Sequence, residues 1–107
     1  MDMFSALADP TRRNILEILA QKGQLSATDI SDKFKISPPA ISQHLKILRE
    51  TKLVDMEKKA QQRLYQLNPD TLATFESWIK KVTYQWEERF TIVDKILEKE
   101  KHILERR

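Results

Sequence analysis

The sequence predicts a mainly α-helical fold that carries a small β-hairpin and ends in one long helix. Apolar residues recur at helical spacing over the first 50 positions, in segments separated by capping residues and prolines. Two short runs between positions 53 and 67 alternate apolar and polar residues, which is typical of strands. After Pro69 there is no further proline or glycine, and the helical spacing continues. The length of 107 residues suits one domain with a single modest core.

Two helices are expected before the only glycine. Phe4 and Leu7 begin an amphipathic stretch. Asp9 then has the character of an N-cap, and Pro10 stands at the first helical position, where its missing N–H does no harm. The second helix should end near Gly23.

The next two segments predict a helix-turn-helix motif. Ser26 is an N-cap candidate with Asp29 in the first turn, which predicts a helix of about eight residues, short by the usual standard. Ser37 caps the following helix, and Pro38 occupies its first position. A turn of about three to four residues should join the two helices. The second helix has a buried stripe made of Ala40, Ile41, Leu45 and Leu48.

Residues 53–67 predict a β-hairpin whose tip lies at 58–62. The tip is charged and rich in glutamine, and it has no Asn-Gly or Asp-Gly pair. Because such pairs favour tight turns, we expect a longer, mobile loop.

One helix of roughly 35 residues, about 50 Å long, should follow from Pro69. Its apolar residues keep a seven-residue frame as far as Trp86, but the next one is Phe90 instead of position 89. This drift matches 3.6 rather than 3.5 residues per turn. The helix should therefore be fairly straight and pack on a globular body and a partner helix instead of forming a long supercoil.

Charge and composition exclude several functions. The net charge is +3, and the basic surplus lies within residues 36–68, which suggests a polyanion-binding surface or an ordinary solvated one. The chain has no cysteine, one glycine and two distant histidines, so thiol chemistry, a phosphate-binding glycine loop and a catalytic pair lack support. No apolar run reaches the ~20 residues of a membrane span, and no signal peptide is evident, so a cytoplasmic protein is expected.

Three segments, "ALADPTRRNILEIL" (6–19), "SATDISDKFKISPPAISQHLKILRETKLV" (26–54) and "RLYQLNPDTL" (63–72), resemble the ArsR family of bacterial winged helix-turn-helix repressors. The resemblance implies a DNA-binding domain over residues 1–68 and a dimerisation helix over 69–107, within one compact domain. It also implies a homodimer that binds an inverted-repeat operator near its own promoter. The alternative is a winged-helix module that binds a partner protein through the long helix.

Base contacts are expected from the exposed face of the helix that begins after Ser37. Gln43 can pair with adenine, and Ser42 can bond to any base edge. Pro39 stands where relatives often have polar groups, so it should contact thymine methyl groups. The alternative is that Ser42 and Gln43 are merely exposed polar residues.

Contacts with the DNA backbone are expected from cationic and polar groups of the same helix and of the hairpin tip. Alternatives are a packed His44, an ion pair of Arg49 with Glu50, and a solvated tip. Arg12 and Arg13 have two alternatives as well, a phosphate contact or an ion pair within the dimer. The predicted backbone contacts are Ser37, His44, Lys46, Arg49, Lys58, Lys59, Gln61, Gln62 and Arg63.

The dimer interface is expected on the first and last helices, and "WEERF" (86–90) resembles a subgroup with an extended last helix. Trp78, Tyr84, Trp86 and Phe90 are an alternative set for a small-molecule pocket, although such aromatic stripes are more often core or interface. The predicted interface residues are Phe4, Leu7, Leu72, Phe75, Ile79, Val82, Trp86, Phe90 and Val93.

No metal site or cofactor is expected. Metal sensors of this family use either a Cys-x-Cys-type motif or an Asp-x-His pair with a later His-x-x-Glu or His-x-x-His. The chain has His102 and Glu105 for the later half, but Arg89 and Thr91 stand where the earlier half would be. The resemblance identifies no effector, so an organic ligand or a partner protein stays open.

Overall fold

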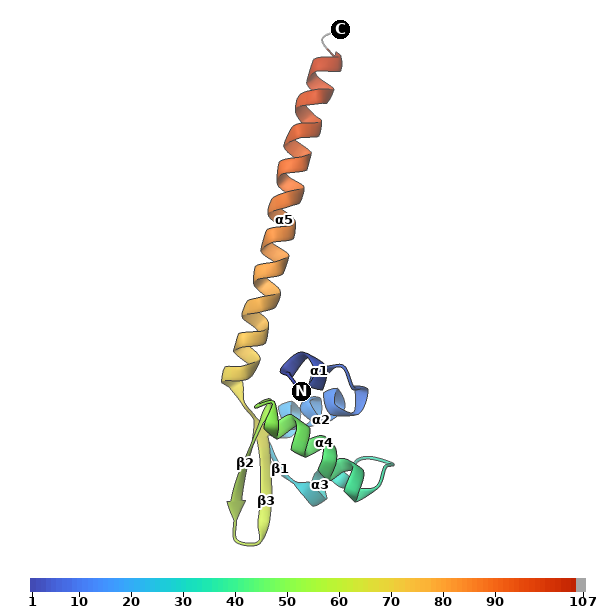
Figure 1. Cartoon of the computed structure of the whole chain (residues 1–107), viewed down its shortest axis with the longest axis vertical. Coiled ribbons are helices and arrows are strands. Elements are labelled where there is room, and N and C mark those ends of the chain that lie inside the picture. Colours follow the sequence, from blue (N-terminus) through green and yellow to red (C-terminus); the bar gives the residue numbers. More distant parts are fainter. Residues whose placement is uncertain (106–107) are drawn as a thin grey trace. The chain divides into compact units, whose positions relative to one another are not determined.

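The computed structural model describes residues 1–105, and it confirms the predicted fold class, a mainly helical winged helix-turn-helix with a long last helix (Figure 1). Met1–Leu72 forms one compact unit and Ala73–Arg107 a second. The strands form one antiparallel sheet in the order β1-β3-β2. The elements are α1 (Met3–Leu7), α2 (Pro10–Lys22), β1 (Gln24–Ser26), α3 (Ala27–Ser31), α4 (Pro38–Glu50), β2 (Val54–Lys59), β3 (Gln62–Leu67) and α5 (Pro69–Glu105).

The ends of α2 are where the capping residues predict them. The Asp9 carboxylate accepts a hydrogen bond from the backbone N–H of Arg12 at 2.9 Å, and Pro10 occupies the first turn. Gly23 ends the helix at φ +86°, a conformation that L side chains rarely adopt. These residues confirm that two helices share the segment before the only glycine.

The core of the first unit lies between α2, α3, α4 and the sheet. The stripe predicted for α4 is buried at Ile41, Leu45 and Leu48, each at most 1% exposed, whereas Ala40 is half-buried. Since α3 has only five residues, it depends on this packing for its stability. The other fully buried large side chains are Ile15, Leu19, Ile30, Leu53 and Val54.

The first helix of the helix-turn-helix is shorter than expected. Its predicted cap is correct, because Ser26 Oγ accepts from Asp29 N at 3.1 Å and the Asp29 carboxylate accepts from Ser26 N. However, α3 ends at Ser31, and tighter i→i+3 bonds continue the chain to Phe34. The predicted length of about eight residues and the three to four residue turn were therefore wrong, since residues 32–37 separate α3 from α4.

The sheet has a third strand that the sequence pattern did not indicate. β1 pairs antiparallel with β3, and Leu25 lies opposite Tyr65. A strand of three residues is too short to show an alternating pattern. Through this pairing, β1 attaches the connection between α2 and α3 to the hairpin.

The hairpin tip is a tight turn, so the prediction of a longer, mobile loop was wrong. Lys59 pairs with Gln62, which leaves only Ala60 and Gln61 to connect β2 and β3. Ala60 adopts φ +54°, the left-handed conformation that turns of this kind require. An alanine can occupy this conformation at a cost in energy, so the absence of an Asn-Gly or Asp-Gly pair does not exclude a tight turn.

The end of α4 directs the chain straight into the hairpin. Leu53 N donates to Leu48 O at 2.9 Å and Lys52 N donates to Arg49 O at 3.1 Å, the two bonds of a Schellman motif. Lys52 adopts the left-handed φ of +62° that this motif needs. Because Leu48 and Leu53 are both fully buried, the motif also has its apolar contact.

The second unit is the remainder of α5 after Leu72. Side chains on this helix are mostly exposed, including large apolar ones such as Trp86 and Leu97. Glu76 and Lys80 form an ion pair one turn apart at 2.7 Å. None of the described helices is long and apolar enough to cross a membrane. The last two residues of the helix predicted for 69–107 lie outside the described part of the chain.

Candidate nucleic-acid interface

The predicted base-contacting residues share the exposed face of α4. Pro39, Ser42 and Gln43 are all exposed, and they lie opposite the buried stripe of the same helix. Lys46 and Arg49 are exposed on the same side, one and two turns further along. The helix therefore presents two cations and two hydrogen-bonding side chains together.

Ser37 has a structural role at the start of this face. Its hydroxyl oxygen accepts a hydrogen bond from Ala40 N at 3.3 Å, and Pro38 follows it in the first turn. The exposed Ser37 hydroxyl keeps its own O–H for another partner. The predicted backbone contact of Ser37 therefore stays a prediction.

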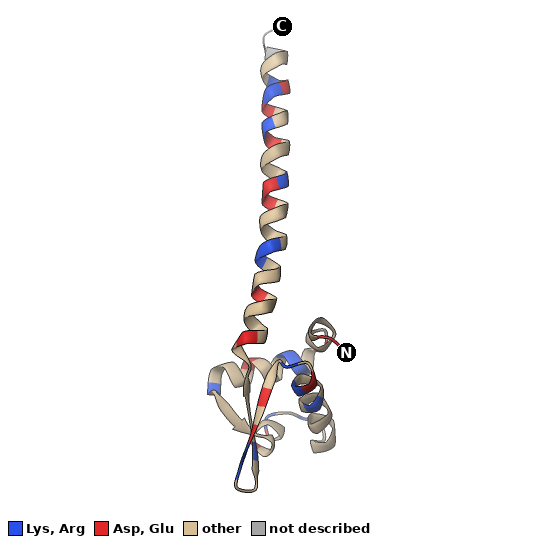
Figure 2. Cartoon of the chain, turned by 60° about the vertical axis from the view of Figure 1, so that its left-hand side comes forward, with Lys and Arg blue, Asp and Glu red and all other residues tan. Residues whose placement is uncertain are grey.

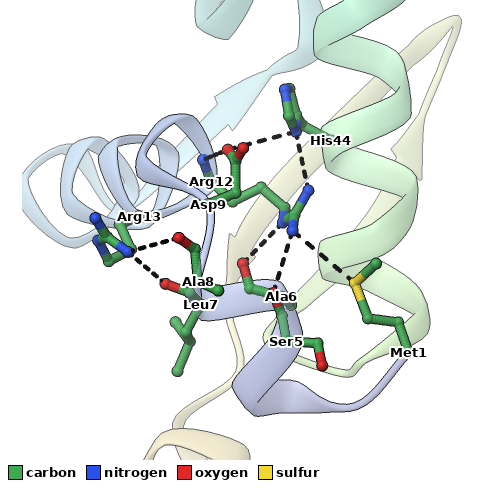
Figure 3. A network of polar contacts seen from close by, with 9 residues as sticks. All are labelled: Met1, Ser5, Ala6, Leu7, Ala8, Asp9, Arg12, Arg13 and His44. Carbon is green, nitrogen blue, oxygen red and sulfur yellow. Dashed lines mark hydrogen bonds and ion pairs between the residues drawn. The ribbon is translucent and has the colours of Figure 1, made fainter.

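His44 points away from that face, toward α2 (Figure 3). Its Nδ1 lies 3.4 Å from Arg12 Nη1 and 3.8 Å from the Asp9 carboxylate, and its side chain is 21% exposed. This placement favours the alternative of a packed histidine. A backbone contact through the remaining ring nitrogen stays a prediction.

Arg12 is buried and holds α1 in place. Its Nε donates to Ala6 O at 2.7 Å and its Nη2 to Ser5 O at 3.2 Å (Figure 3), and the residue is only 8% exposed. These carbonyls belong to the end of α1, where helical partners run out. Arg12 therefore serves as a cap within its own chain, a role that neither sequence alternative included.

Arg13 has a similar but exposed role. Its Nη1 donates to Leu7 O at 2.7 Å and to Ala8 O at 3.0 Å. The two arginines together supply donors to four consecutive carbonyls between positions 5 and 8. A five-residue helix followed closely by two arginines is the only sequence signal that could have suggested that these arginines donate to the carbonyls at the end of the helix.

The carboxylate of Asp9 connects this network to the α2 cap. The hydrogen bond from the backbone N–H of Arg12 lowers the pKa of Asp9, and the nearby His44 and Arg12 side chains lower it further. Partial burial of the carboxyl group works in the opposite direction. Asp9 therefore stays ionised in the folded protein at lower pH than an ordinary aspartate.

The hairpin tip brings together the five residues predicted there, all of them exposed. Figure 2 colours the lysine and arginine positions of the hairpin blue. Lys58 lies directly opposite Arg63 across the two strands, and Lys59 lies opposite Gln62. Two cations directly opposite each other repel, which destabilises an isolated hairpin. A bound polyanion would reverse that effect, because it would neutralise both charges.

The predicted dimer residues fall into two groups. Leu7 and Leu72 are half-buried and pack against the core of their own unit, while Phe75 is half-buried. Within α5, Trp86 and Phe90 contact each other edge to face, with ring centroids 4.7 Å apart. The remaining residues are between 41% and 57% exposed, and they are Phe4, Ile79, Val82, Trp86, Phe90 and Val93.

Two further features of the sequence lie on α5, the set of aromatic residues and the half of a metal site. A shallow depression on α5 is lined by Trp86, Arg89, Phe90 and Val93, so Trp78 and Tyr84 are not part of it. Among the described residues, no three side chains of metal-ligating type converge. The side chain of Glu105 lies outside the described part of the chain.

Comparisons with known proteins give a consistent family. Residues 9–55 match the model of "Bacterial regulatory protein, arsR family". The transcriptional repressor SdpR of Bacillus subtilis is 40% identical over 78 residues, which cover 73% of this chain and 86% of SdpR. Among solved structures, the ArsR-like transcriptional regulator from Rhodococcus sp. RHA1 has a TM-score of 0.76 at 27% identity and 87% coverage of both chains.

A second solved structure among the similar proteins is described as a homodimer. The homodimeric winged helix-turn-helix DNA-binding domain of Mb0332 from Mycobacterium bovis, described as a possible ArsR-family regulator, has a TM-score of 0.60 at 25% identity. The match covers 74% of this chain and 72% of the Mb0332 chain. With the match to the family model and the identity to SdpR, the chain belongs to the ArsR family of bacterial regulatory proteins.

Proposed function

We propose that this chain is a homodimeric, sequence-specific DNA-binding repressor, located in the cytoplasm, that binds an inverted-repeat operator near its own promoter. The observation that carries the proposal is that one unit presents both the exposed polar and cationic face of α4 and a hairpin tip whose cations lie opposite each other. A phosphate backbone would supply the missing counter-charge. The repressor named among the relatives supports the direction of regulation.

The roles of individual residues follow from their positions. Ser42 and Gln43 would bond to base edges in the major groove, and Pro39 would contact a thymine methyl group. Lys46 and Arg49 would contact phosphates on either side of the groove. The tip, from Lys58 to Arg63, would lie over the flanking backbone or the minor groove.

A dimer is part of the proposal, because an inverted repeat has two half-sites. Two recognition helices must lie about 34 Å apart to meet successive major grooves on one side of DNA. Only a fixed dimer keeps that distance. The exposed apolar side chains of α5 and the homodimer among the structural relatives support it.

The alternative, a module that binds a partner protein, has less support. Such a module has no use for cations at the hairpin tip or for an exposed polar face on α4. Both are present in this chain. The family, whose named members are transcriptional regulators, likewise favours DNA over an enzymatic or purely structural role.

Binding to the DNA upstream of the chain's own gene tests the proposal. The logarithm of the affinity should fall linearly with the logarithm of the salt concentration, because cations released from phosphates drive binding. Footprinting should show protection of an inverted repeat. A protein that binds this DNA no better than unrelated DNA, or whose affinity ignores salt, would contradict the proposal.

A further inference from the structure

We propose that the start of α4 recognises a pyrimidine by its 5-methyl group, through an apolar surface made of Ile36, Pro38 and Pro39. This inference rests on the proposed function and extends the thymine contact given there for Pro39. It adds two residues to that contact and names the class of base, which is thymine or 5-methylcytosine. It follows from the exposure of the three side chains, the hydrogen bonds around Ser37 and the positions of the prolines on the helix.

Ile36 stands out among the apolar side chains of the first unit. Within the described residues 5–72 it is the only large apolar side chain that is exposed, at 39%. Phe34, two residues earlier, is packed against the core instead. Ile36 alone would need no explanation, since single apolar side chains are common on protein surfaces. However, Pro38 and Pro39 follow it closely and are exposed as well, so the three side chains extend the apolar surface along the chain.

The first turn of α4 has no free backbone N–H at positions 38–40. Pro38 and Pro39 have none, and the N–H of Ala40 donates to the Ser37 hydroxyl oxygen at 3.3 Å. The first N–H groups of a helix are otherwise well placed to bind the phosphates of DNA. The two prolines therefore remove a polar contact that a helix start ordinarily offers, and apolar ring atoms take its place.

The prolines lie on the face of α4 that is proposed to contact bases. Pro38 stands one turn before Ser42. Pro39 likewise stands one turn before Gln43, and all four side chains are exposed. A helix whose Ser42 and Gln43 reach base edges in the major groove therefore brings the prolines to base edges too. Because the apolar surface continues the proposed DNA interface, we infer that DNA covers it, and not a partner protein.

The chemistry of these side chains restricts what they can recognise. In the major groove the apolar group at base edges is the 5-methyl group of thymine. Cytosine methylated at C5 presents the same group at the same ring position, whereas uracil and unmethylated cytosine have only hydrogen there. Isoleucine and proline side chains have no hydrogen-bonding group, so they cannot distinguish the O4 of thymine from the amino group of cytosine. They distinguish bases by the burial of the methyl group.

The size of the effect follows from the area that one methyl group buries. Removing one buried methyl group should weaken binding about fourfold. An inverted repeat has two half-sites, so removing the methyl group from both should weaken binding about 15-fold. Because the methyl group is uncharged, this ratio should stay the same when the salt concentration changes, whereas phosphate contacts weaken with salt.

Replacing thymine by uracil in the operator tests the inference with the full chain. The replacement removes only the methyl group and keeps every hydrogen-bonding group of the base. The inverted repeat found by footprinting is prepared with uracil at each thymine in turn, in both half-sites together. We expect at least one position at which binding weakens about 15-fold. At that position 5-methylcytosine should bind more tightly than cytosine by the same factor.

Two variants of Pro39 form a matched pair. Pro39→Ser and Pro39→Val both gain the backbone N–H that proline lacks, but only valine keeps an apolar side chain. Pro39→Val should therefore keep the ratio of thymine to uracil affinity, and Pro39→Ser should lower it. Adding Ile36→Ser to Pro39→Ser should bring the ratio close to one. Each ratio compares two DNAs with the same protein, so a general loss of affinity or of folded protein cancels.

Several results would overturn the inference. Uracil also changes the stacking and flexibility of DNA, an effect that does not depend on the side chains at positions 36 and 39. An equal ratio in wild type and in the Ile36→Ser, Pro39→Ser double variant would therefore mean that the methyl group is not read by this surface. A thymine effect without a matching 5-methylcytosine effect would contradict the proposed class of base.

The same experiment separates this inference from the proposed function. Salt-dependent binding to an operator that tolerates uracil at every thymine would leave the proposed function standing and refute the methyl contact. The apolar surface would then indicate a partner protein. Absence of any protected inverted repeat would refute the proposed function and this inference together.

Discussion

Arg12 Nε donates a hydrogen bond to the carbonyl oxygen of Ala6 at 2.7 Å, inside the unit formed by Met1–Leu72. Both residues are buried, Ala6 completely. α1 has only five residues, so its own hydrogen bonds cannot stabilise it. The Arg12 side chain therefore fixes α1 to α2. It also lies beside α4, because its Nη1 is 3.4 Å from Nδ1 of His44.

Replacing Arg12 by alanine should destabilise the protein by about 1–3 kcal/mol, because a buried carbonyl loses its donor. Urea unfolding followed by circular dichroism measures the change. Arg13→Ala is the matched control, since its bonds to Leu7 and Ala8 are exposed to water, which can replace them. Equal effects of the two variants would show that the buried bond has no special weight.

Acid should weaken the structure in part through Asp9. Its pKa is lowered in the folded state, first by the hydrogen bond from Arg12 N, so its contribution to stability is complete above the unfolded pKa of about 3.9. That contribution is lost as the pH falls through the lower, folded pKa. Asp9→Asn keeps a good N-cap but cannot titrate, so its stability should fall less steeply with acid.

The comparison requires unfolding free energies of wild type and Asp9→Asn between about pH 2 and pH 6. Asp32→Asn, at an exposed position, controls for the loss of one carboxylate. If Asp9→Asn and wild type lose stability in parallel below pH 4, the titration of Asp9 does not determine how the unfolding free energy falls in acid.

The caps show what local sequence determines. Asp9, Ser26 and Ser37 each accept a hydrogen bond from the N–H three residues later, as expected of their residue types at those places. Such bonds depend on a few neighbours only. The starts of α2, α3 and α4 could therefore be predicted from the sequence.

Features that depend on distant residues could not be predicted. β1 exists because β3, about 40 residues later, offers a partner. Arg12 is buried because α1 folds back over it and α4 lies beside it, so its carbonyl partners are invisible in a linear pattern. For the site, exposure on α4 and the alternative of a packed His44 followed from helical spacing, but the partners of His44, Arg12 and Asp9, did not.

The α4 face and the hairpin tip should affect DNA binding in different ways. Replacing Ser42 and Gln43 together by alanine should cost about 1–3 kcal/mol for each lost base contact and flatten the preference for the operator. Lys59→Ala should weaken binding to all DNA alike and reduce the salt slope by about 1. Titrations of operator and unrelated DNA at several salt concentrations separate the two effects.

Full operator preference in the Ser42 and Gln43 double variant would mean that other residues recognise the bases. Glu17→Ala, at an exposed position of α2, outside the residues predicted to contact DNA, is a suitable control for general effects on the fold. It should leave both the preference and the salt slope unchanged.

Metal ions should not release this protein from DNA. Arsenite and cadmium require thiolate ligands, and the chain has no cysteine. Zinc usually needs three or four ligands around one ion. Titrating the three ions into a preformed operator complex should leave the complex intact, so occupancy would depend on protein concentration, an organic ligand or a partner protein. Stoichiometric metal binding with release of DNA, abolished by His102→Ala, would overturn this expectation.

Glycine in place of Ala60 should stabilise the hairpin tip. Ala60 has φ +54°, where an L side chain costs about 1–2 kcal/mol, and glycine avoids that cost. Glycine also gives the unfolded chain more freedom, which offsets up to about 1 kcal/mol of the gain. The net increase in unfolding free energy should therefore be about 0.5–1 kcal/mol.

The matched control is Ala20→Gly, since Ala20 is exposed within α2 and has no need of a left-handed conformation. There glycine should destabilise by about 0.5–1 kcal/mol. The two alanine-to-glycine changes thus have opposite expected signs, and urea unfolding of both variants beside wild type resolves them. A loss of stability at both positions would show that Ala60 does not hold the tight turn in the left-handed conformation.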